Sequence, residues 1–321
     1  MGALRNGEGA HFMNHFISCD WGTSRFRLRL IELNQKRIVR EHTTNQGIQS
    51  LAAAHSVIDA RRAMMGNVLE SGLAALGVAD QPAIPVVISG MASSTLGWQS
   101  LPYAQLPAPI DGSTLRYLDF LHSGRKVRLI SGLQAASDVM RGEETELIGL
   151  FSPPARRALA ENSIVVLPGT HSKHVRLRAG KIINFTTYLT GELYALLSQN
   201  STLATPDAAV FDPAAFIAGA KASQNHGLSA ALFQTRAQTV LGLLAAKHSR
   251  AFLSGVLIGA EIAALAETPA DQIVLAASDP IVSHYTLALS ELLPAALVIK
   301  IPPTELAAAT VQGHAQILSY P

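Results

Sequence analysis

Short apolar runs that end at small or polar residues recur along this chain. Residues 16–19 are apolar or small and end at Asp20, and residues 25–31 alternate basic with apolar side chains at a period of two. Such alternation is typical of a half-buried strand in an antiparallel pair. We therefore predict a β-hairpin whose turn is the Asp-Trp-Gly-Thr-Ser segment at residues 20–24.

The rest of the first half combines helices with buried strands. Apolar residues at helical spacing predict a helix over residues 56–76, and short continuous apolar runs predict strands at 86–88 and 127–130. A proline-rich passage over residues 101–109 separates these two strands, and a helix is expected over residues 143–151.

The second half restarts this layout. Residues 164–167 and 175–178 predict a second hairpin, which continues into a strand at 181–187. The later elements are a helix opening at Thr190, helices beginning near Pro213, Leu228 and Phe252, and a strand at 273–275. We expect the boundary between Ser131 and Asp138, which gives domains of residues 1–135 and 136–321.

Composition supports two domains of a globular protein. The chain has 321 residues, whereas a single core stops growing at roughly 250–300 residues. Hydrophobic residues make up 48% and charged residues 15%, and no run of about 18 apolar residues is free of charges and turn formers, so no membrane span is expected. The formal net charge is +2 with scattered basic residues, which does not favour a nucleic-acid partner.

Cysteine usage and the start of the chain indicate a cytoplasmic protein. Cys19 is the only cysteine, which excludes internal disulfides and cysteine-based zinc clusters and fits a reducing compartment. Residues 1–12 lack the basic start and long apolar centre of a secretion signal.

The two predicted hairpin turns carry the candidate chemistry. Each places glycine and hydroxyl residues directly after a strand, where backbone N–H groups can converge on a phosphate. One such turn by itself fits an ordinary hairpin equally well. Two turns, one in each half, favour a nucleotide phosphate chain held between two similar lobes.

In the order and composition of these motifs, the chain resembles the superfamily of sugar kinases, heat-shock proteins and actin. An acidic residue at a strand end followed by Gly-Thr-Ser, a second Gly-Thr turn and a late strand with a small-residue turn carry the likeness. Within the superfamily, the order of motifs from about Phe16 to the chain's end resembles the 2-dehydro-3-deoxygalactonokinase family. These motifs are Ser89-Gly90-Met91 with Gly97-Trp98 and Pro102-Tyr103, residues 138–145, residues 168–174, and residues 190–193.

The resemblance implies both a fold and an activity. The fold is α/β, a two-domain actin-like ATPase (ribonuclease H-like) fold with mixed sheets flanked by helices and an interdomain cleft. The activity is phosphorylation of the C6 hydroxyl of 2-dehydro-3-deoxy-D-galactonate in galactonate catabolism, with ATP and Mg²⁺ as cofactors.

Phosphoryl transfer requires a donor held in line and its charge neutralised by magnesium. Asp20 is expected to hold Mg²⁺ through water, because that ion keeps much of its hydration shell. Lys173 can add a positive charge near the moving phosphoryl group. The expected phosphate contacts are Gly22, Thr23 and Ser24 on one side, and Gly169, Thr170, His171 and Ser172 on the other.

A general base must be a carboxylate or histidine within reach of the acceptor hydroxyl. The superfamily resemblance implies a position before or at the start of a helix upstream of the second turn, where Asp138, Glu143 and Glu144 lie. We rank Asp138 first and Glu143 second. Acids in a first helical turn also stabilise the helix, so this alternative stays open for each of them.

The keto-acid substrate presents a carboxylate, a carbonyl and hydroxyls. Arg25 can bind the carboxylate in a bidentate contact. Its alternative is a solvated strand arginine in series with Arg27 and Arg29. Trp98 and Tyr103 fit a binding loop or packing against the core. The expected substrate residues are Arg25, Met91, Trp98, Tyr103 and Glu144.

The adenosine part of ATP is expected in the C-terminal half. Gly255 and Gly259 lie four apart on a helix and allow close approach of a ligand, although packing against a neighbouring helix explains the spacing equally well. Ser278 is expected at the adenosine site and as the cap of the next helix, with Pro280 at or near its first position.

Two alternative functions remain open. One is a kinase for another sugar acid or keto-deoxy acid, and the other is a non-catalytic ATP-binding sensor. The expected partner is a small-molecule keto-deoxy sugar acid. The alanine-rich late helices fit a core or the face of a homodimer equally well.

Overall fold

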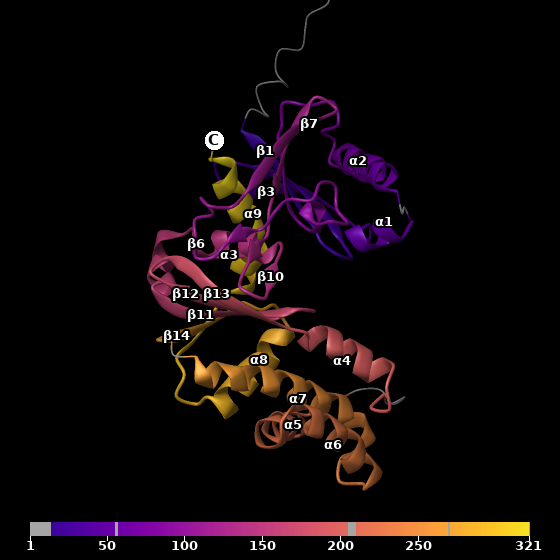
Figure 1. Cartoon of the computed structure of the whole chain (residues 1–321), viewed down its shortest axis with the longest axis vertical. Coiled ribbons are helices and arrows are strands. Elements are labelled where there is room, and N and C mark those ends of the chain that lie inside the picture. Colours follow the sequence, from indigo (N-terminus) through magenta and orange to yellow (C-terminus); the bar gives the residue numbers. More distant parts are fainter. Residues whose placement is uncertain (1–13, 55–56, 205–209, 269, 321) are drawn as a thin grey trace, which may run out of the picture. The chain divides into compact units, whose positions relative to one another are not determined.

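The computed structural model describes residues 14–54, 57–204, 210–268 and 270–320 (Figure 1). The expectation for residues 1–12 therefore lies outside the described residues. The chain divides into two compact units. Unit 1 contains Met1–Ala158, Gly180–Ile182 and Ala307–Pro321, and unit 2 contains Leu159–Ala179 and Ile183–Leu306.

Unit 1 is built on a six-stranded mixed sheet in the order β3-β2-β1-β4-β8-β7. Its strands are β1 (His15–Trp21), β2 (Phe26–Glu32), β3 (Arg37–Thr44), β4 (Val86–Gly90), β7 (Tyr117–His122) and β8 (Arg125–Ile130). β1 and β2 pair antiparallel up to Trp21 and Phe26, which confirms the first predicted hairpin. β4 runs parallel to both β1 and β8. β4 is buried at every position, as expected for a central strand covered on both faces.

The helices of this unit supply the rest of its core. They are α1 (Ile48–Ala54), α2 (Ile58–Ala75), α3 (Glu143–Phe151) and, at the end of the chain, α9 (Pro303–Leu318). The predicted helices over 56–76 and 143–151 are thus found, and α2 buries Met65, Leu69 and Leu73 in the hydrophobic core. A small sheet in the order β10-β9-β5 joins β5 (Ala104–Gln105), β9 (Leu133–Gln134) and β10 (Val139–Met140).

The division into units differs from the expected boundary between Ser131 and Asp138. α3 follows that boundary in the sequence but belongs to unit 1. The reason is close packing with α9, because a Cβ at Gly149 would lie 1.8 Å from the carbonyl oxygen of Ala309. Likewise, a Cβ at Gly313 would lie 2.0 Å from the carbonyl oxygen of Thr145.

Unit 2 contains a second mixed sheet with strands ordered β15-β14-β11-β12-β13. They are β11 (Asn162–Leu167), β12 (Ser172–Arg178), β13 (Lys181–Tyr188), β14 (Gln272–Leu275) and β15 (Val298–Lys300). The order ends with β6 (Ala108–Pro109), which pairs with Lys181 and Ile182, two residues of unit 1.

The two sheets share one layout. In each, an antiparallel hairpin comes first, and two later strands add in parallel beside its first strand. Both predicted phosphate turns therefore occupy the same place in their sheets, between the two strands of the hairpin.

Five α-helices accompany the second sheet in the described part of unit 2. They are α4 (Thr190–Gln199), α5 (Pro213–His226), α6 (Leu228–Val240), α7 (Ser249–Ala263) and α8 (Ile281–Leu292). Figure 1 shows α5, α6 and α7 side by side. Asp212 caps α5 by accepting a hydrogen bond from the N–H of Ala215 at 2.6 Å.

α7 is the central helix of unit 2. Among the described residues, the segment Ala246–Glu267 is the one long and apolar enough to cross a membrane, and 67% of its most apolar window is buried inside the protein. A buried core helix passes the same test of length and composition.

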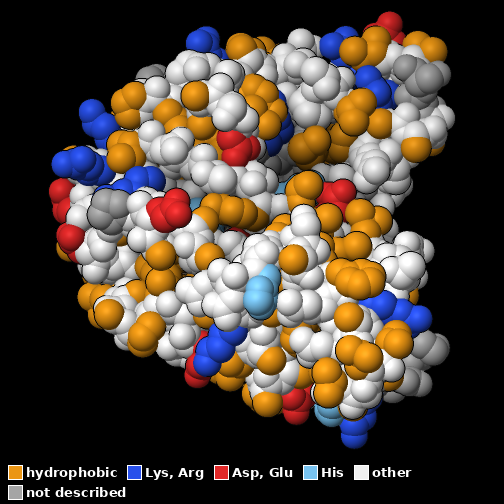
Figure 2. Space-filling view, turned by 60° about the horizontal axis from the view of Figure 1, so that its bottom comes forward, with side chains coloured by type: hydrophobic (Ala, Val, Ile, Leu, Met, Phe, Trp, Pro, Cys, Tyr) orange, Lys and Arg blue, Asp and Glu red, His pale blue; other side chains and the backbone are white. Residues whose placement is uncertain are grey.

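On the face shown in Figure 2, hydrophobic side chains lie between scattered charged ones.

Candidate active site

Backbone hydrogen bonds within the first turn and from the start of α1 fix its conformation. The N–H of Gly22 donates to the carbonyl of Arg25 at 2.9 Å, which closes the turn. The N–H groups of Ile48 and Gln49, at the start of α1, donate to the carbonyls of Gly22 and Thr23 at 3.1 and 3.0 Å. Thr23 and Arg25 are exposed, as is Ser24, so their side chains are open to a ligand.

Asp20, Glu143, Glu144 and Glu146 interact electrostatically, and we call them the acid cluster. Asp20 is on β1, and the three glutamates lie in the first turn of α3. Gly142 is the N-cap residue before this helix, and its φ of 111° favours glycine.

The acids of the cluster differ in what they bind. The carboxylate of Glu143 accepts the N–H of Arg141 at 3.1 Å. Glu144 is fully buried and accepts the N–H of Gly142 at 2.7 Å and the hydroxyl of Thr145 at 3.0 Å. The carboxylate of Glu144 is thus bound at the start of its own helix, as the alternative of a helix-stabilising role expects.

Burial and mutual repulsion raise the pKa values in the cluster. Burial, followed by the charge of Glu143, raises the pKa of Glu144 to about 7. The pKa of Glu146 rises to about 8, chiefly through burial and then through Glu143, Asp20 and Glu144. Burial also raises the pKa of Asp20, with a smaller opposing effect of Arg27 and Arg29.

Asp138 lies outside this cluster. It sits between β9 and β10, where its carbonyl accepts the N–H of Ala135 at 2.8 Å and its carboxylate accepts the N–H of Val139 at 2.7 Å. It is not among the groups whose charge shifts the pKa of Asp20, Glu144 or Glu146.

The aromatic residues of the predicted substrate loop have two different roles. Trp98 is 9% exposed and packs edge-on against Trp21 and Phe120, with ring centroids 6.2 and 5.4 Å apart. It is therefore a core residue, and the packing alternative describes it correctly. Tyr103 is half-buried, and the guanidinium of Arg141 lies 4.2 Å from its ring centroid.

Arg141, from the segment after β10, and Met91 also lie at the predicted substrate loop. Nη1 of Arg141 donates to the carbonyl of Ser93 at 2.7 Å, and its Nε is buried with no hydrogen-bond partner among the described residues. Met91 is half-buried at the end of β4. Arg29, which was grouped with Arg25 as a solvated strand arginine, is instead buried and bound to Glu41 at 2.6 Å.

The second turn is joined to the start of α4. The N–H of Glu192 donates to the carbonyl of Thr170 at 3.0 Å, and the carboxylate of Glu192 binds Nε2 of His171 at 2.5 Å. A Cβ at Gly191 would lie 2.5 Å from the carbonyl oxygen of Gly169, so only glycine allows this approach. A glycine turn and a helix N-terminus thus meet at one place, which suits an anion.

Two turn residues point inward. The hydroxyl of Ser172 is buried and donates to Glu261 at 2.6 Å. Lys173 is 3% exposed, and its ammonium donates to the carbonyl of His171 at 2.9 Å. A positive charge therefore lies beneath the turn, whereas Gly169, Thr170 and His171 are exposed.

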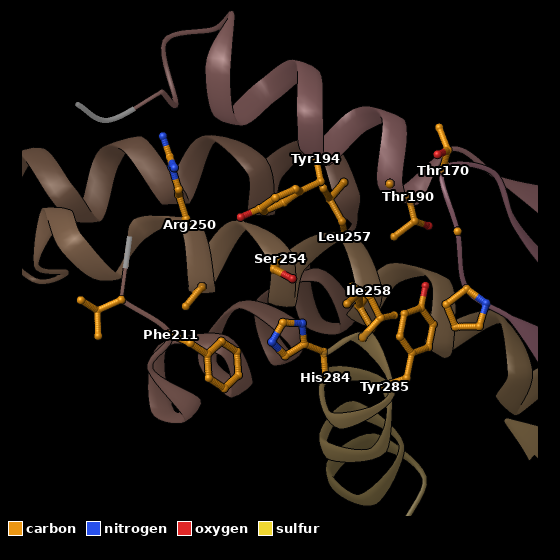
Figure 3. A pocket seen from close by; sticks show the side chains of 16 residues that line it. Thr170, Thr190, Tyr194, Phe211, Arg250, Ser254, Leu257, Ile258, His284 and Tyr285 are labelled. Carbon is orange, nitrogen blue, oxygen red and sulfur yellow. The ribbon is translucent and has the colours of Figure 1, made fainter. Parts of the chain in front are cut away.

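A pocket of about 490 Å³ opens beside the second turn, within unit 2 (Figure 3). Its volume falls in the range of small-molecule sites. Its walls are mainly apolar, with one end at the glycine turn. The lining residues are Pro168, Gly169, Thr170, Thr190, Gly191, Tyr194, Val210, Phe211, Arg250, Ala251, Ser254, Leu257, Ile258, Ile281, His284 and Tyr285.

Two polar side chains lie in the middle of the pocket, those of Ser254 and His284 (Figure 3). Nδ1 of His284 is buried without a hydrogen bond in the described part of the chain. The ring of His284 stacks on Phe211 with centroids 4.4 Å apart, and burial lowers its pKa.

The expected adenosine residues are not those that line the pocket. Gly255 and Gly259 face α5, because a Cβ would lie 1.9 Å from the carbonyl oxygen of Phe216 and 2.5 Å from Cα of Ala220. Helix packing explains these glycines. Ser278 does not line the pocket, and its side chain does not cap α8.

Several site residues carried no local signal in the sequence. Phe211, Ser254, His284 and Tyr285 belong to different elements that only the fold brings together. Glu261 is the exception, since a lone carboxylate in the apolar segment 251–262 must have buried partners.

A magnesium ion fits the acid cluster only as a partly hydrated ion. Within the described ranges, no three His, Cys, Asp or Glu side chains are arranged to hold a metal. Mg²⁺ is commonly bound through one or two carboxylates, substrate phosphates and water. Asp20 supplies a carboxylate of this kind.

Structural comparison places the chain among known proteins. A solved structure of a 2-dehydro-3-deoxygalactonokinase protein from Sinorhizobium meliloti is 29% identical, with a TM-score of 0.77 over 95% of this chain and 97% of that chain. The ADPNP-bound activator of 2-hydroxyisocaproyl-CoA dehydratase from Clostridium difficile shares the fold, with a TM-score of 0.50 and 13% identity over 94% of this chain and 93% of that one. The predicted α/β fold class, of the actin-like ATPase and sugar kinase type, is confirmed.

Sequence comparison is more specific. A 2-dehydro-3-deoxygalactonokinase of Rhizobium meliloti (strain 1021) is 33% identical over 78% of this chain and 79% of its own length. A protein of the same name from Escherichia coli (strain K12) is 38% identical over 63% of this chain and 68% of its own length. The sequence model of the family described as 2-keto-3-deoxy-galactonokinase matches residues 20–315, which include both turns and the acid cluster. The chain therefore belongs to the 2-keto-3-deoxy-galactonokinase family.

Proposed function

We propose that the protein transfers the γ-phosphoryl group of ATP to the C6 hydroxyl of 2-dehydro-3-deoxy-D-galactonate. The products are the 6-phosphate and ADP, and the reaction belongs to galactonate catabolism. The observation that carries this proposal is the family match over residues 20–315, and a pocket of nucleotide size beside a glycine turn supports it.

The pocket of unit 2 is the proposed adenosine site. Its apolar walls suit a purine, and Nδ1 of His284, which is buried without a partner among the described residues, suits the polar edge of the base, with the hydroxyl of Ser254 nearby in the pocket. Because a buried polar group without a partner is costly, a bound base that meets Nδ1 of His284 gains affinity and selectivity.

The second turn is the proposed phosphate site. The exposed backbone of Gly169–His171 and the N-terminus of α4 supply N–H groups, while Lys173 beneath the turn adds positive charge. Gly22, Thr23 and Ser24 of unit 1 are proposed to donate to the phosphates as well, since their turn is equally preorganised.

Magnesium is proposed to be held by Asp20 through water. When bound, the ion would neutralise charge on the phosphate oxygens. The protein's own contribution is to keep the carboxylate of Asp20 near the first turn, where Arg27 and Arg29 oppose the rise of its pKa.

Glu143 is our preferred general base, ahead of Asp138. Glu143 shares the acid cluster with Asp20, whereas Asp138 is bound to the backbone of its own hairpin. A general base must lie near the reacting groups, and Asp20 is the residue proposed to hold the magnesium ion there.

The substrate carboxylate is proposed to bind arginine. Arg25 is exposed beside the first turn, and Arg141 is stacked on Tyr103 with its Nε unpartnered among the described residues. Met91, at the end of β4, is the proposed apolar contact. Trp98 and Glu144 support this loop from the core.

The location and the partners of the protein also remain proposals. We place the protein in the cytoplasm, because its single cysteine fits a reducing compartment, and we propose a homodimer without nucleic-acid or membrane partners. Light scattering across a concentration series tests the homodimer, and a constant monomer mass would contradict it.

The function is tested by ADP release with ATP and Mg²⁺ on a panel of acceptors. The panel contains 2-dehydro-3-deoxygalactonate, its gluconate epimer, galactonate, glycerol and a hexose, and ³¹P NMR identifies the phosphorylated position. We expect turnover confined to the first acceptor or the first two, with phosphate at C6. Turnover on another acceptor of the panel would contradict the proposed substrate and keep the kinase activity. ATP binding without turnover on any acceptor would favour a non-catalytic sensor.

A further inference from the structure

Glu261 is a buried carboxylate at the centre of unit 2. It lies on α7 and is 2% exposed, in a segment that is otherwise apolar. A charge in such a place costs free energy unless hydrogen bonds satisfy it.

Four side chains satisfy this carboxylate. Its Oε1 accepts from the hydroxyl of Ser172 at 2.6 Å and binds Nε2 of His174 at 2.9 Å. Its Oε2 accepts from the hydroxyl of Thr190 at 2.5 Å and from the hydroxyl of Tyr285 at 2.7 Å. Each oxygen therefore has two partners, and all four partners are buried.

These partners come from three separate walls of the candidate nucleotide site. Ser172 and His174 belong to β12 and follow the glycine turn directly. Thr190 is the first residue of α4, whose N-terminus meets that turn. Tyr285 is on α8 and lines the apolar pocket, as Figure 3 shows.

We infer that Glu261 is a positioning residue that fixes the glycine turn and the N-terminus of α4 relative to the apolar pocket. This inference rests on the proposed function, which puts adenosine in the pocket and phosphates at the turn. Glu261 itself does not line the pocket, so it acts through Ser172, Thr190 and Tyr285.

The network explains why a carboxylate is tolerated close to a phosphate site. Four donors spread its negative charge over hydroxyl and imidazole groups, so the charge facing the turn is weakened. A carboxylate accepts on both oxygens, whereas a glutamine side chain offers one acceptor and one donor. Glu261→Gln therefore keeps the size of the side chain and disturbs the network.

The test compares ATP with adenosine as ligands of the full-length protein. Isothermal titration calorimetry gives the Kd of each ligand for the wild type, for Glu261→Gln and for Glu267→Gln, which makes the same change at an exposed site beyond α7. We expect the Kd for ATP to rise about tenfold or more in Glu261→Gln. The Kd for adenosine should change less than about threefold, because the apolar walls remain.

Three outcomes decide the inference. Equal loss of ATP and adenosine binding, or no loss of either, would overturn it. Failure of the wild type to bind ATP would instead contradict the proposed function. If circular dichroism shows that Glu261→Gln does not fold, Ser172→Ala and Thr190→Val each remove one donor, and each must weaken ATP binding more than adenosine binding.

Discussion

The two units hold their acidic side chains in opposite ways. In unit 2, the buried carboxylate of Glu261 binds four side chains from β12, α4 and α8. In unit 1, Asp20, Glu143, Glu144 and Glu146 lie within electrostatic reach of one another, and burial and repulsion raise several of their pKa values.

The supply of hydrogen-bond donors makes the difference. A buried carboxylate with four partners fixes the groups around it. Carboxylates that repel one another are stabilised when a proton or a cation binds, because the repulsion is relieved. The first arrangement suits a framework for binding the donor nucleotide, and the second suits proton transfer and magnesium.

The largest expected effect is on turnover. Glu143→Gln removes the proposed base, and we expect kcat to fall by about 10²–10⁴-fold, the usual contribution of general base catalysis. The Kd for ATP should stay within about twofold, because an interaction used only in the transition state does not change ground-state binding. ADP release and calorimetry give the two values.

Asp138→Asn is the matched variant for this prediction. It makes the same chemical change at the other ranked carboxylate, and kcat should fall by less than about tenfold. Loss of turnover in Asp138→Asn with normal turnover in Glu143→Gln would contradict this prediction. The general base would then be Asp138, which does not belong to the acid cluster.

A second variant disturbs the helix that carries Glu261. In Gly255→Ala, the added Cβ would lie 1.9 Å from the backbone of Phe216, so α5 and α7 must move apart. We expect the free energy of unfolding to fall by about 1–3 kcal/mol, as overpacked cores do. Ser254→Ala, one residue earlier and facing the pocket, is the control. Equal stability of the two variants in urea would contradict the close packing.

The third prediction concerns pH and the acid cluster. The pKa of Glu146 is raised to about 8 in the folded protein, so the folded state holds a proton that the unfolded state has lost. Stability should therefore decrease as pH rises from the unfolded pKa to about 8. Glu146→Gln removes this penalty, and we expect it to gain about 1–2 kcal/mol above pH 8 and nothing below pH 4.5.

Chemical denaturation of both proteins across this pH range, without nucleotide or magnesium, measures the effect. A stability difference that does not change with pH would show that the pKa of Glu146 is not raised in the folded protein.

The smallest effect is expected at the half-exposed pair of His171 and Glu192. Glu192→Gln weakens the tie between the second turn and α4, so the Kd for ATP should rise about two- to threefold, with less than about 1 kcal/mol lost in stability. Because salt screens exposed charges, the loss should shrink at high ionic strength. A loss of ATP affinity in Glu192→Gln as large as that in Glu261→Gln would contradict the claim that the buried network around Glu261 is the main support of the second turn.

Much of the fold could be predicted from local patterns. Both hairpins, the helix over 143–151 and the helices near Pro213 and Leu228 follow from periodicity and turn chemistry. The return of α9 to unit 1 could not, because it depends on backbone contacts of Gly149 and Gly313 with segments far away in the sequence.

The site was predictable only where its chemistry is local. The two glycine turns are visible in the sequence, and so is the acidic start of α3. The pocket was not, because His284 and Phe211 are ordinary residues until α8 and the start of α5 bring them together. Both alternatives for Trp98 stayed open in the sequence, which does not distinguish an aromatic side chain in a binding loop from one packed on the core, and the structure packs Trp98 on the core.

The most direct test measures kcat and the Kd for ATP side by side in Glu143→Gln and Glu261→Gln. If unit 1 supplies the reacting carboxylate and unit 2 holds the donor, Glu143→Gln loses turnover with normal ATP binding, and Glu261→Gln loses ATP binding. Loss of both quantities to the same extent in both variants would contradict this division of roles.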